Sequence, residues 1–413
     1  MTLIPPSHRF DRSRSSAQFS RLSKTLFVGG LCVLSICTTT RCTAQVKPAA
    51  PPDVLVLSNG DTLHGKLLNA AGGKVTFHSD PLGDISVGFD KITELHTSDN
   101  FAVIRNGVYQ IKKKEAAAIP TGPLEISNKT VTLHPTNATP PAPLAVADTQ
   151  YIMDQATLDK QVKTRPGFFE GWNGSATAGV TTVNATQHSY AVSAGVGLVR
   201  VVPTVSWVAP SNRTSVDFLG SSGKTTQPSY TTPTTPPVFV PEVSTKTSIY
   251  HADAERDEYL TTRMFALALA AFDHNYSQNL DLQQIYGGGL GWTAIKTPTQ
   301  ELDLKGTIQY ERQHFSTGQS LNLVGSTFSA EYLLKHKFWN FMQGVAYIPA
   351  YNDASAYSVN ETNLLSFAAY KNFSFSIGTL DSYLNNPPAS LPPTRRNSFQ
   401  FTMGLTYAIK SKY

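Results

Sequence analysis

The sequence predicts an all-β protein: a transmembrane antiparallel up-and-down β-barrel of about twelve strands, preceded by a small SH3-like or Sm-like β-domain. Three observations support this prediction. Charged residues make up 15% of the chain, below the roughly 25% of soluble domains. Long segments alternate apolar and polar residues over the second half. The chain also ends on such a segment, which closes on an aromatic residue.

The alternating segments indicate strands that cross a membrane. Residues 172–181, 189–198, 302–311 and 399–410 place apolar and polar side chains on opposite faces. They run for about 9–14 residues, whereas the usual strand has about 5–6 and a tilted membrane strand needs about 9–11. A soluble β-sandwich is the alternative, and this length disfavours it.

Residues 1–44 have the pattern of a signal peptide rather than of folded structure. A basic stretch precedes the apolar segment Leu26–Cys37, and Cys42-Thr43-Ala44 resembles a cleavage site. An N-terminal membrane anchor is the alternative, but a spanning helix needs about 20 apolar residues and this segment is much shorter. The pattern therefore predicts export.

Removal of this leader changes the charge and the cysteine content. Residues 1–44 carry six cations and one anion, a net charge of +5, and the whole chain is +5, so the mature chain is 5 − 5 = 0. No nucleic-acid partner is expected from this balance. Cys32, Cys37 and Cys42 all leave with the leader. The mature chain is therefore expected to hold no disulfide and no thiolate metal site. We also expect no cofactor.

The remaining chain divides by composition. Residues 45–52 form a Pro/Ala linker, and residues 53–118 read as the small β-domain, with turn signals between short apolar segments. Residues 119–165 form a Pro/Thr-rich linker, in which Tyr151–Lys163 has the spacing of a short amphipathic helix. The barrel is expected over residues 168–413. The β-domain would then lie in the periplasm, where it has access to an envelope partner.

The connections between the predicted strands should alternate short and long. Short turns are expected near residues 296–298, 336–337 and 370–372, and long loops at 220–246, 351–360 and 384–397. The segment 200–212 is long for a turn, which leaves the register of the third strand open. The terminal FQFTMGLTYAIKSKY is the type of strand that the barrel-insertion machinery recognises, so this machinery and outer-membrane lipid are expected partners.

Several motifs resemble a bacterial family of unknown function, domain of unknown function 481. They are FDHNYSQNLDLQ, YGGGLGW and LDLKGTIQYER within Phe265–Phe315, and PGFFEGWNGSATAGV at Pro166–Val180. LSNGDTLHGKLL is similar to a small domain that some longer members carry. The family's members are described as salt-stress-induced outer-membrane proteins, so the resemblance implies a barrel and a location but no catalytic residues. The chain departs from the family pattern at 183–186, where a Gly-Asn-Ser turn is usual, and at 200–246.

Four residues with metal-binding side chains share one strand face. His251, Asp253, Glu255 and Asp257 follow one another at every second position. Such a row can bind a divalent cation, or it can form a polar lumen wall with Arg256, Arg263, Lys305 or Arg312 as ion-pair partners. We expect the lumen wall and no metal site, because lumen positions of membrane barrels are normally polar.

The alternation assigns side chains to the two faces of the barrel. Lumen-lining positions are expected at Thr177, Asp253, Glu255, Asp303, Lys305, Glu311 and Glu331. Interfacial aromatic residues are expected at Trp172, Trp292, Tyr310, Tyr332 and Tyr407. The glycines of 287–291, together with Ala266, Ala268 and Ala270, suggest that one flank of the interior has a low side-chain volume.

One motif allows an enzymatic alternative. His314 and Ser316 are two residues apart at a strand end, so a Ser/His nucleophilic pair is geometrically feasible, with Asn322 as the nearby orienting amide. Outer-membrane phospholipases resemble this pattern. We nevertheless expect no enzyme, but an outer-membrane barrel that acts as a narrow pore, a binding platform or an envelope-stress structural protein. The alternative is a barrel-embedded lipid hydrolase.

Overall fold

The computed structural model describes residues 51–108, 111, 113–135, 139–184, 188–232, 235–387 and 396–411. The expected signal peptide, most of the 45–52 linker and the terminal Tyr413 lie outside these residues. No helix in the described part of the chain is both long and apolar enough to cross a membrane.

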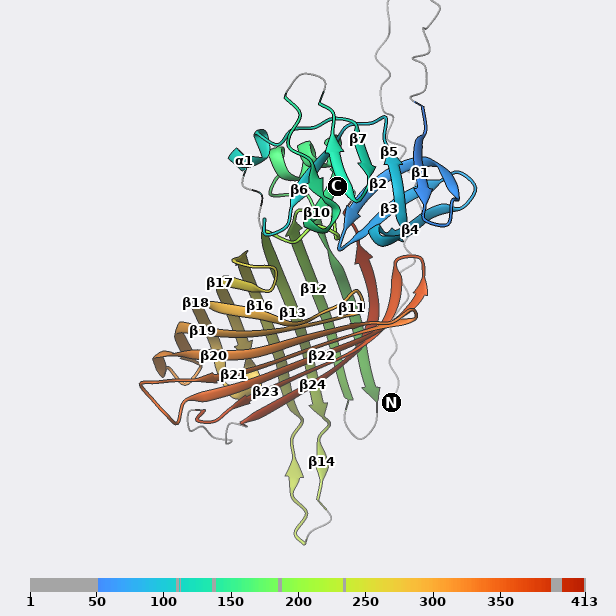
Figure 1. Ribbon diagram of the computed structural model, residues 1–413. Coiled ribbons are helices and arrows are strands. Elements are labelled where there is room, and N and C mark those ends of the chain that lie inside the picture. Colours follow the sequence, from blue (N-terminus) through green and yellow to red (C-terminus); the bar gives the residue numbers. More distant parts are fainter. Residues whose placement is uncertain are drawn as a thin grey trace, which may run out of the picture. The chain divides into compact units, whose positions relative to one another are not determined.

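The small β-domain predicted from the sequence is confirmed (Figure 1). Its sheet runs in the order β4-β3-β2-β1-β5-β7-β8-β9, and β10 pairs with both β2 and β6. The strands are β1 Asp53–Leu57, β2 Thr62–Ala71, β3 Lys74–Ser79, β4 Gly83–Gly88, β5 Ile92–His96, β6 Phe101–Arg105, β7 Leu124–Ser127, β8 Thr130–Leu133, β9 Leu144–Ala145 and β10 Thr149–Asp154. The helical segments are η1 Phe89–Lys91, α1 Lys113–Ala117, η2 Val146–Asp148, α2 Gln155–Thr157 and η3 Leu158–Thr164.

Local sequence explains how this sheet closes on a core. Gly60, with φ of +89°, supplies the left-handed residue of the turn between β1 and β2. Leu55, Phe77 and Leu95 alternate with solvent-facing residues and are fully buried. Buried Asp53 holds two segments together, because its carboxylate accepts hydrogen bonds from the amides of Leu67 and Ser98, both at 2.8 Å.

The sheet extends beyond residue 118, where the sequence placed the end of the β-domain. β7 pairs with β5 through Leu95 and Ile126, and β10 pairs with β2 through Ile152 and Ala70. The expected helix over Tyr151–Lys163 begins only after Asp154. Its first residues are strand because Ile152 and Met153 fill the sheet's two clusters of buried side chains.

The rest of the chain forms a closed barrel of twelve antiparallel strands, as the sequence predicted. They are β11 Trp172–Asn184, β12 His188–Val202, β13 Asn212–Gln227, β16 Val243–Tyr259, β17 Met264–Asn275, β18 Leu280–Lys296, β19 Gln300–Phe315, β20 Ser320–Lys335, β21 Trp339–Pro349, β22 Tyr357–Tyr370, β23 Phe373–Leu384 and β24 Asn397–Ile409. Thr177 of β11 faces Gly195 of β12 on one side and Thr406 of β24 on the other, which closes the sheet. β14 Tyr230–Thr231 and β15 Phe239–Val240 pair in the β13–β16 loop.

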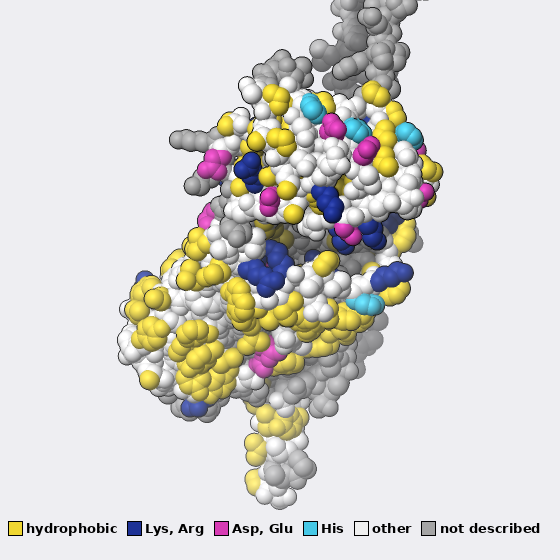
Figure 2. Space-filling model, in the orientation of Figure 1, with side chains coloured by type: hydrophobic (Ala, Val, Ile, Leu, Met, Phe, Trp, Pro, Cys, Tyr) yellow, Lys and Arg dark blue, Asp and Glu magenta, His cyan; other side chains and the backbone are white. Residues whose placement is uncertain are grey.

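The outer face of the barrel is broadly apolar, and Figure 2 shows hydrophobic side chains gathered across it. Leu290 and Trp292 of β18 are 55% and 47% exposed, and Phe401 and Leu405 of β24 are 52% and 59% exposed. Soluble monomers rarely expose contiguous apolar surface beyond a few hundred Å². A lipid environment accommodates such a face.

The connections define two ends of the barrel. The end at which β11 begins and β24 finishes is called the terminal end, and it has the connections 203–211, 260–263, 297–299, 336–338 and 371–372. The opposite end is called the loop end, and it has the other six connections, near 185–187, 228–242, 276–279, 316–319, 350–356 and 385–396. The expected 220–246 loop is shorter than predicted, because β13 continues to Gln227 and β16 begins at Val243.

The long 203–211 connection packs on residues that precede the barrel. Trp207 and Val208 are partly buried and pack against the buried cluster of Tyr151, Leu158 and Val162. The backbone N–H of Ala209 donates to the Tyr151 hydroxyl at 3.1 Å. The unusual length of this connection therefore provides apolar contacts. The register of the third strand, β13, which the sequence left open, is set by its pairing with β12, in which Val202 faces Asn212.

Candidate functional site in the barrel interior

Strand pairing decides which side chains face the interior. On β19 the odd-numbered residues are buried, whereas Leu304, Ile308 and Tyr310 are exposed on the outer face. Paired residues on neighbouring strands share a face, so the same assignment can be followed around the barrel. It places the seven expected lumen residues on the inner face: Thr177, Asp253, Glu255, Asp303, Lys305, Glu311 and Glu331.

Arg213 of β13 is the centre of one interior charge cluster. Its guanidinium forms ion pairs with Asp257 at 2.7 Å, Asp303 at 2.7 Å and Glu301 at 3.1 Å. The same group lies 5.3 Å from the centre of the Phe265 ring, a favourable cation–π position. These contacts join β13, β16, β17 and β19 across the interior near the terminal end.

Lys305 of β19 is the centre of a second cluster. Its Nζ lies 2.6 Å from Glu255 of β16 and 2.7 Å from Glu331 of β20. The side chains of Lys305 and Glu255 are 4% and 10% exposed, while that of Glu331 is 54% exposed. Two carboxylates therefore share one buried ammonium group, an arrangement in which loss of the cation leaves buried charge uncompensated.

His251 of β16 lies between two carboxylates nearer the loop end. Its Nδ1 is 2.6 Å from Asp273 and its Nε2 is 3.1 Å from Asp253. Both contacts can be hydrogen bonds only when both ring nitrogens carry a proton. The inner face of β18 and β19 adds Glu311, which accepts bonds from the amides of Gln283 and Gln313, both at 2.5 Å.

The opposite wall is built from hydroxyl groups. Thr177 and Thr406 are hydrogen-bonded at 2.7 Å across the β11–β24 seam. Ser376 continues the chain of hydroxyls to Thr406 at 2.5 Å and to Ser366 at 2.9 Å. The interior thus has one wall rich in carboxylates and one wall of neutral hydroxyls.

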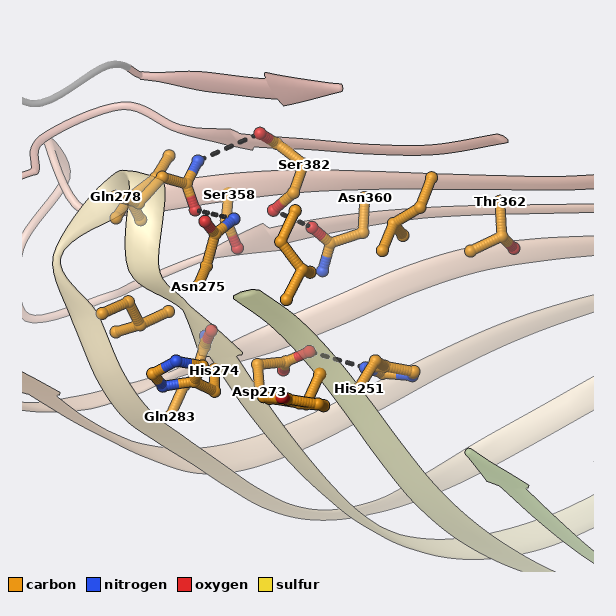
Figure 3. A pocket seen from close by; sticks show the side chains of 15 residues that line it. His251, Asp273, His274, Asn275, Gln278, Gln283, Ser358, Asn360, Thr362 and Ser382 are labelled. Carbon is orange, nitrogen blue, oxygen red and sulfur yellow. Dashed lines mark hydrogen bonds and ion pairs between the residues drawn. The ribbon is translucent and has the colours of Figure 1, made fainter. Parts of the chain in front are cut away.

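A cavity of about 60 Å³ lies between these two walls (Figure 3). His251, Asp273 and Gln283 line one side, and Asn360 and Thr362 belong to β22 on the other. Gln278 reaches across, since its amide donates to the backbone carbonyls of Ser382 at 3.0 Å and Arg396 at 2.9 Å. The cavity is polar on both sides and is narrowed by this amide.

Apolar side chains also meet across the interior. Ile285 of β18 packs with Ile348 of β21, and Leu280 and Phe315 pack with Leu384 of β23. These strands are not neighbours in the sheet, so the contacts span the lumen. Near the loop end the lumen is therefore narrowed by packed side chains as well as by hydrogen bonds.

Gly291 of β18 makes room for the inward ring of Phe265. A Cβ built on Gly291 would lie 2.2 Å from the Phe265 ring, so only glycine fits there. The expectation that Ala266, Ala268 and Ala270 lower the interior volume is wrong. These alanines lie on the outer face, because their paired residues are the outward Leu290, Gly288 and Tyr286. The inner face of β17 instead carries Phe265, Leu267 and Leu269.

The five expected interfacial aromatic residues lie on the outer face. Trp292, Tyr310 and Tyr407 are 47%, 44% and 44% exposed. Trp172 pairs with Arg200 and Tyr332 with Leu302, both on outward positions. Tyr310 lies toward the loop end and the other four toward the terminal end. This placement is compatible with two aromatic girdles, which stay a prediction.

The two residues of the hydrolase alternative are not bonded to each other. His314 lies on the outer face of β19, and its Nδ1 is 2.8 Å from the Ser320 hydroxyl. Ser316 donates instead to the carbonyl of Asn279 at 3.4 Å. Asn322 accepts a hydrogen bond from Tyr310 at 2.8 Å. The three side chains therefore do not form a nucleophile–base–orienter chain.

Sequence reasoning identified Lys305 as an ion-pair partner but missed others. Arg213 could not be assigned to a face from the sequence because the register of the third strand was left open. The signal that places it inward is its spacing of four residues from Asp217, since residues an even number of positions apart on a strand share a face. Arg256 and Arg312, two partners considered from the sequence, face outward, and Arg256 pairs with Glu258 at 2.7 Å. Within the described chain, no group of three His, Cys, Asp or Glu residues is placed to hold a metal ion.

These features define a class: an antiparallel membrane-type β-barrel with an apolar exterior, a polar interior and a β-domain before it. The family described as "Protein of unknown function, DUF481" matches residues 204–409, from the connection before β13 to the end of β24. The chain belongs to this family through its barrel. No curated protein matches the chain.

The chain is also similar in structure to several solved barrels. An outer membrane channel from Pseudomonas putida F1 shares 11% identity over 59% of this chain and 99% of that chain, with a TM-score of 0.33. A NanC porin shares 10% identity over 57% of this chain and all of its own, with a TM-score of 0.33. The translocator domain of the autotransporter NalP from Neisseria meningitidis shares 10% identity over 57% and 87%, with a TM-score of 0.28. The barrel assignment itself rests on the closed strand register.

Proposed function

We propose that this chain is a non-enzymatic outer-membrane barrel whose lumen is a narrow conduit that prefers small cations. One observation carries the proposal: in the described interior, carboxylates outnumber cationic groups. The inward carboxylates are Asp217, Asp253, Glu255, Asp257, Asp273, Glu301, Asp303, Glu311 and Glu331, and the inward basic groups are Arg213, His251, Lys296, Lys305 and Lys335. A lumen wall with an excess of one charge concentrates the opposite ion.

Contacts at the loop end would make this conduit narrow. Gln278 holds the 276–279 connection against β23 and the start of β24 through two backbone carbonyls, and Leu280 packs with Leu384 across the lumen. The cavity that remains between the walls has a volume of about 60 Å³, close to the size of two water molecules. Solutes larger than ions that have lost most of their hydration shell would be excluded.

The placement in the outer membrane is part of the same proposal. The signal-peptide pattern of residues 1–44, the apolar outer face and the closed sheet all support it. The terminal end of the barrel would face the periplasm, together with the β-domain and any envelope partner of that domain.

Conductance in a planar lipid bilayer tests the proposal. Refolded protein is expected to show small, cation-preferring steps, with a reversal potential shifted toward that of K⁺ in a KCl gradient. Gln278→Ala with Leu280→Gly removes the two contacts that narrow the loop end and should raise the conductance several-fold. Leu304→Ala, a truncation on the outer face, is the matched control and should not change it. If neither the parent nor the opened variant conducts, the conduit is excluded, which leaves a binding platform or structural protein.

A further inference from the structure

A group of outward cations lies at the loop end of the barrel. Lys224 of β13 directly faces Lys246 of β16, and Tyr190 of β12 faces Lys224 from the other side. Tyr190 is 54% exposed, so all three side chains share the outer face. Two like charges directly opposite each other in a sheet are destabilising unless an anion lies between them.

A second outward cation lies three strands away, in the half of β19 nearer the loop end. Arg312 of β19 lies on the outer face between Gln284 of β18 and Asn322 of β20, both neutral. β16, β17, β18 and β19 are consecutive in the barrel, and their register aligns Arg312 with Ala252, six residues along β16 from Lys246. Lys246 and Arg312 are therefore farther apart than the separation of about 14 Å between their strands. The 224–246 pair and Arg312 thus form two basic positions along one arc of the rim.

These three cations differ from the barrel arginines and lysine that lie beside carboxylates. Arg213, Lys305 and Arg256 all form ion pairs with carboxylates. Among the described residues, no carboxylate lies within ion-pair distance of Lys224, Lys246 or Arg312. Two exposed acidic residues, Glu242 and Asp281, also lie at this end, and neither is bonded to these cations.

The outward residues that precede the cations, followed along each strand toward the loop end, mark the edge of the apolar surface. On β16 the outward order toward the loop end is Ala252, Tyr250, Ser248, Lys246, and on β19 it is Ile308, Tyr310, Arg312. Both strands thus pass from apolar through tyrosine to cation. Tyrosine is the residue that favours the boundary between hydrocarbon and headgroups. The cations are therefore at the level of lipid headgroups.

We propose that Lys224, Lys246 and Arg312 form a binding site for the phosphate groups of a phosphorylated glycolipid in the outer leaflet. The lysine pair binds one phosphate between its two ammonium groups, and Arg312 binds a second through its planar guanidinium. The acyl chains of the same lipid lie along the apolar surface below, beside Tyr250 and Tyr310. This inference rests on the proposed outer-membrane placement, because only there does this rim meet such a lipid.

Binding of a bis-phosphorylated lipid A to the full mature chain in detergent micelles tests the site. The dephosphorylated lipid is the comparison ligand. The parent protein should bind the phosphorylated form more tightly, and added salt should weaken this binding. Lys224→Gln with Lys246→Gln should lower the affinity about 25-fold, since each cation contributes about fivefold near a charged lipid surface. Arg312→Gln should lower it about fivefold.

Lys337→Gln with Lys371→Gln is the matched control, because it removes two cations from turns at the opposite end of the barrel. It should leave the affinity within about twofold of the parent. Equal binding of the two lipids by the parent, or equal losses in the control and in the lysine-pair variant, would overturn the proposal. The heat-dependent gel shift of each variant is read in parallel. A normal shift with no lipid preference refutes this site alone, whereas a missing shift in the parent refutes the membrane barrel itself.

Discussion

Replacing Lys305 by methionine should destabilise the barrel by about 3 kcal/mol at neutral pH. Methionine fills a similar volume but leaves Glu255, which is 10% exposed, without its cation at 2.6 Å. Removal of one partner from a buried ion pair costs about 3–5 kcal/mol. The lower end of this range applies because Glu331, the second partner, is 54% exposed and water screens it.

Urea unfolding of the refolded protein measures this effect, with the heat-dependent gel shift as the signal for folded barrel. The midpoint should fall while the slope stays constant, as expected when stability alone changes. Lys337→Met is the matched control, since Lys337 is exposed in the 336–338 connection, and its cost should stay within about 0.5 kcal/mol.

The double variant Lys305→Met with Glu255→Gln distinguishes the ion pair from simple packing. Neutralising Glu255 removes the uncompensated charge, so the double variant should recover more than half of the lost stability. If Lys305→Met costs less than about 1 kcal/mol, or if Glu255→Gln adds a further loss instead of a recovery, the reasoning from buried charge is refuted.

Three further predictions concern the fold. Gly291→Ala should lower the urea midpoint by the equivalent of about 1–3 kcal/mol, because the new Cβ meets the Phe265 ring. Phe265→Leu in the same chain should restore part of the lost stability. An unchanged midpoint in Gly291→Ala would show that the ring moves freely. Asp53→Ala should destabilise the β-domain by about 2–4 kcal/mol, since two amides lose their acceptor, and hydrogen exchange at Leu67 and Ser98 should rise while barrel amides stay protected. The folded chain should migrate faster on an unheated detergent gel than after boiling; a chain that is soluble without detergent and shows no shift would contradict the membrane barrel.

The strand architecture of the barrel could be predicted from the sequence. Period-two alternation is a local property, so residues such as Asp303 and Lys305 could be assigned to one face of a strand before any partner was known. The length of the alternating segments predicted that the strands cross a membrane. In the structure, side chains along β19 and β24 alternate between the inner and the outer face, as the sequence pattern predicted.

The partners of those side chains could not be read in the same way. Arg213 lies far along the chain from Asp303 and Glu301, and only the register of five strands, β13 and β16 to β19, brings them within 4 Å. A shift of one residue in any strand reverses its inner and outer faces. The alanines of β17 show this effect, since a single step separates them from the inward Leu267 and Leu269.

The width of the lumen could not be predicted from the sequence. Ile285 meets Ile348, and Leu280 meets Leu384, between strands that are not adjacent in the sheet. Such contacts depend on the curvature of the closed barrel, which no local pattern encodes. The alternation of apolar and polar residues determines which face of the sheet a side chain lies on, because the geometry of a strand backbone points successive side chains to opposite faces. The closure of the barrel determines which residues that side chain contacts, because closure depends on the register of every strand.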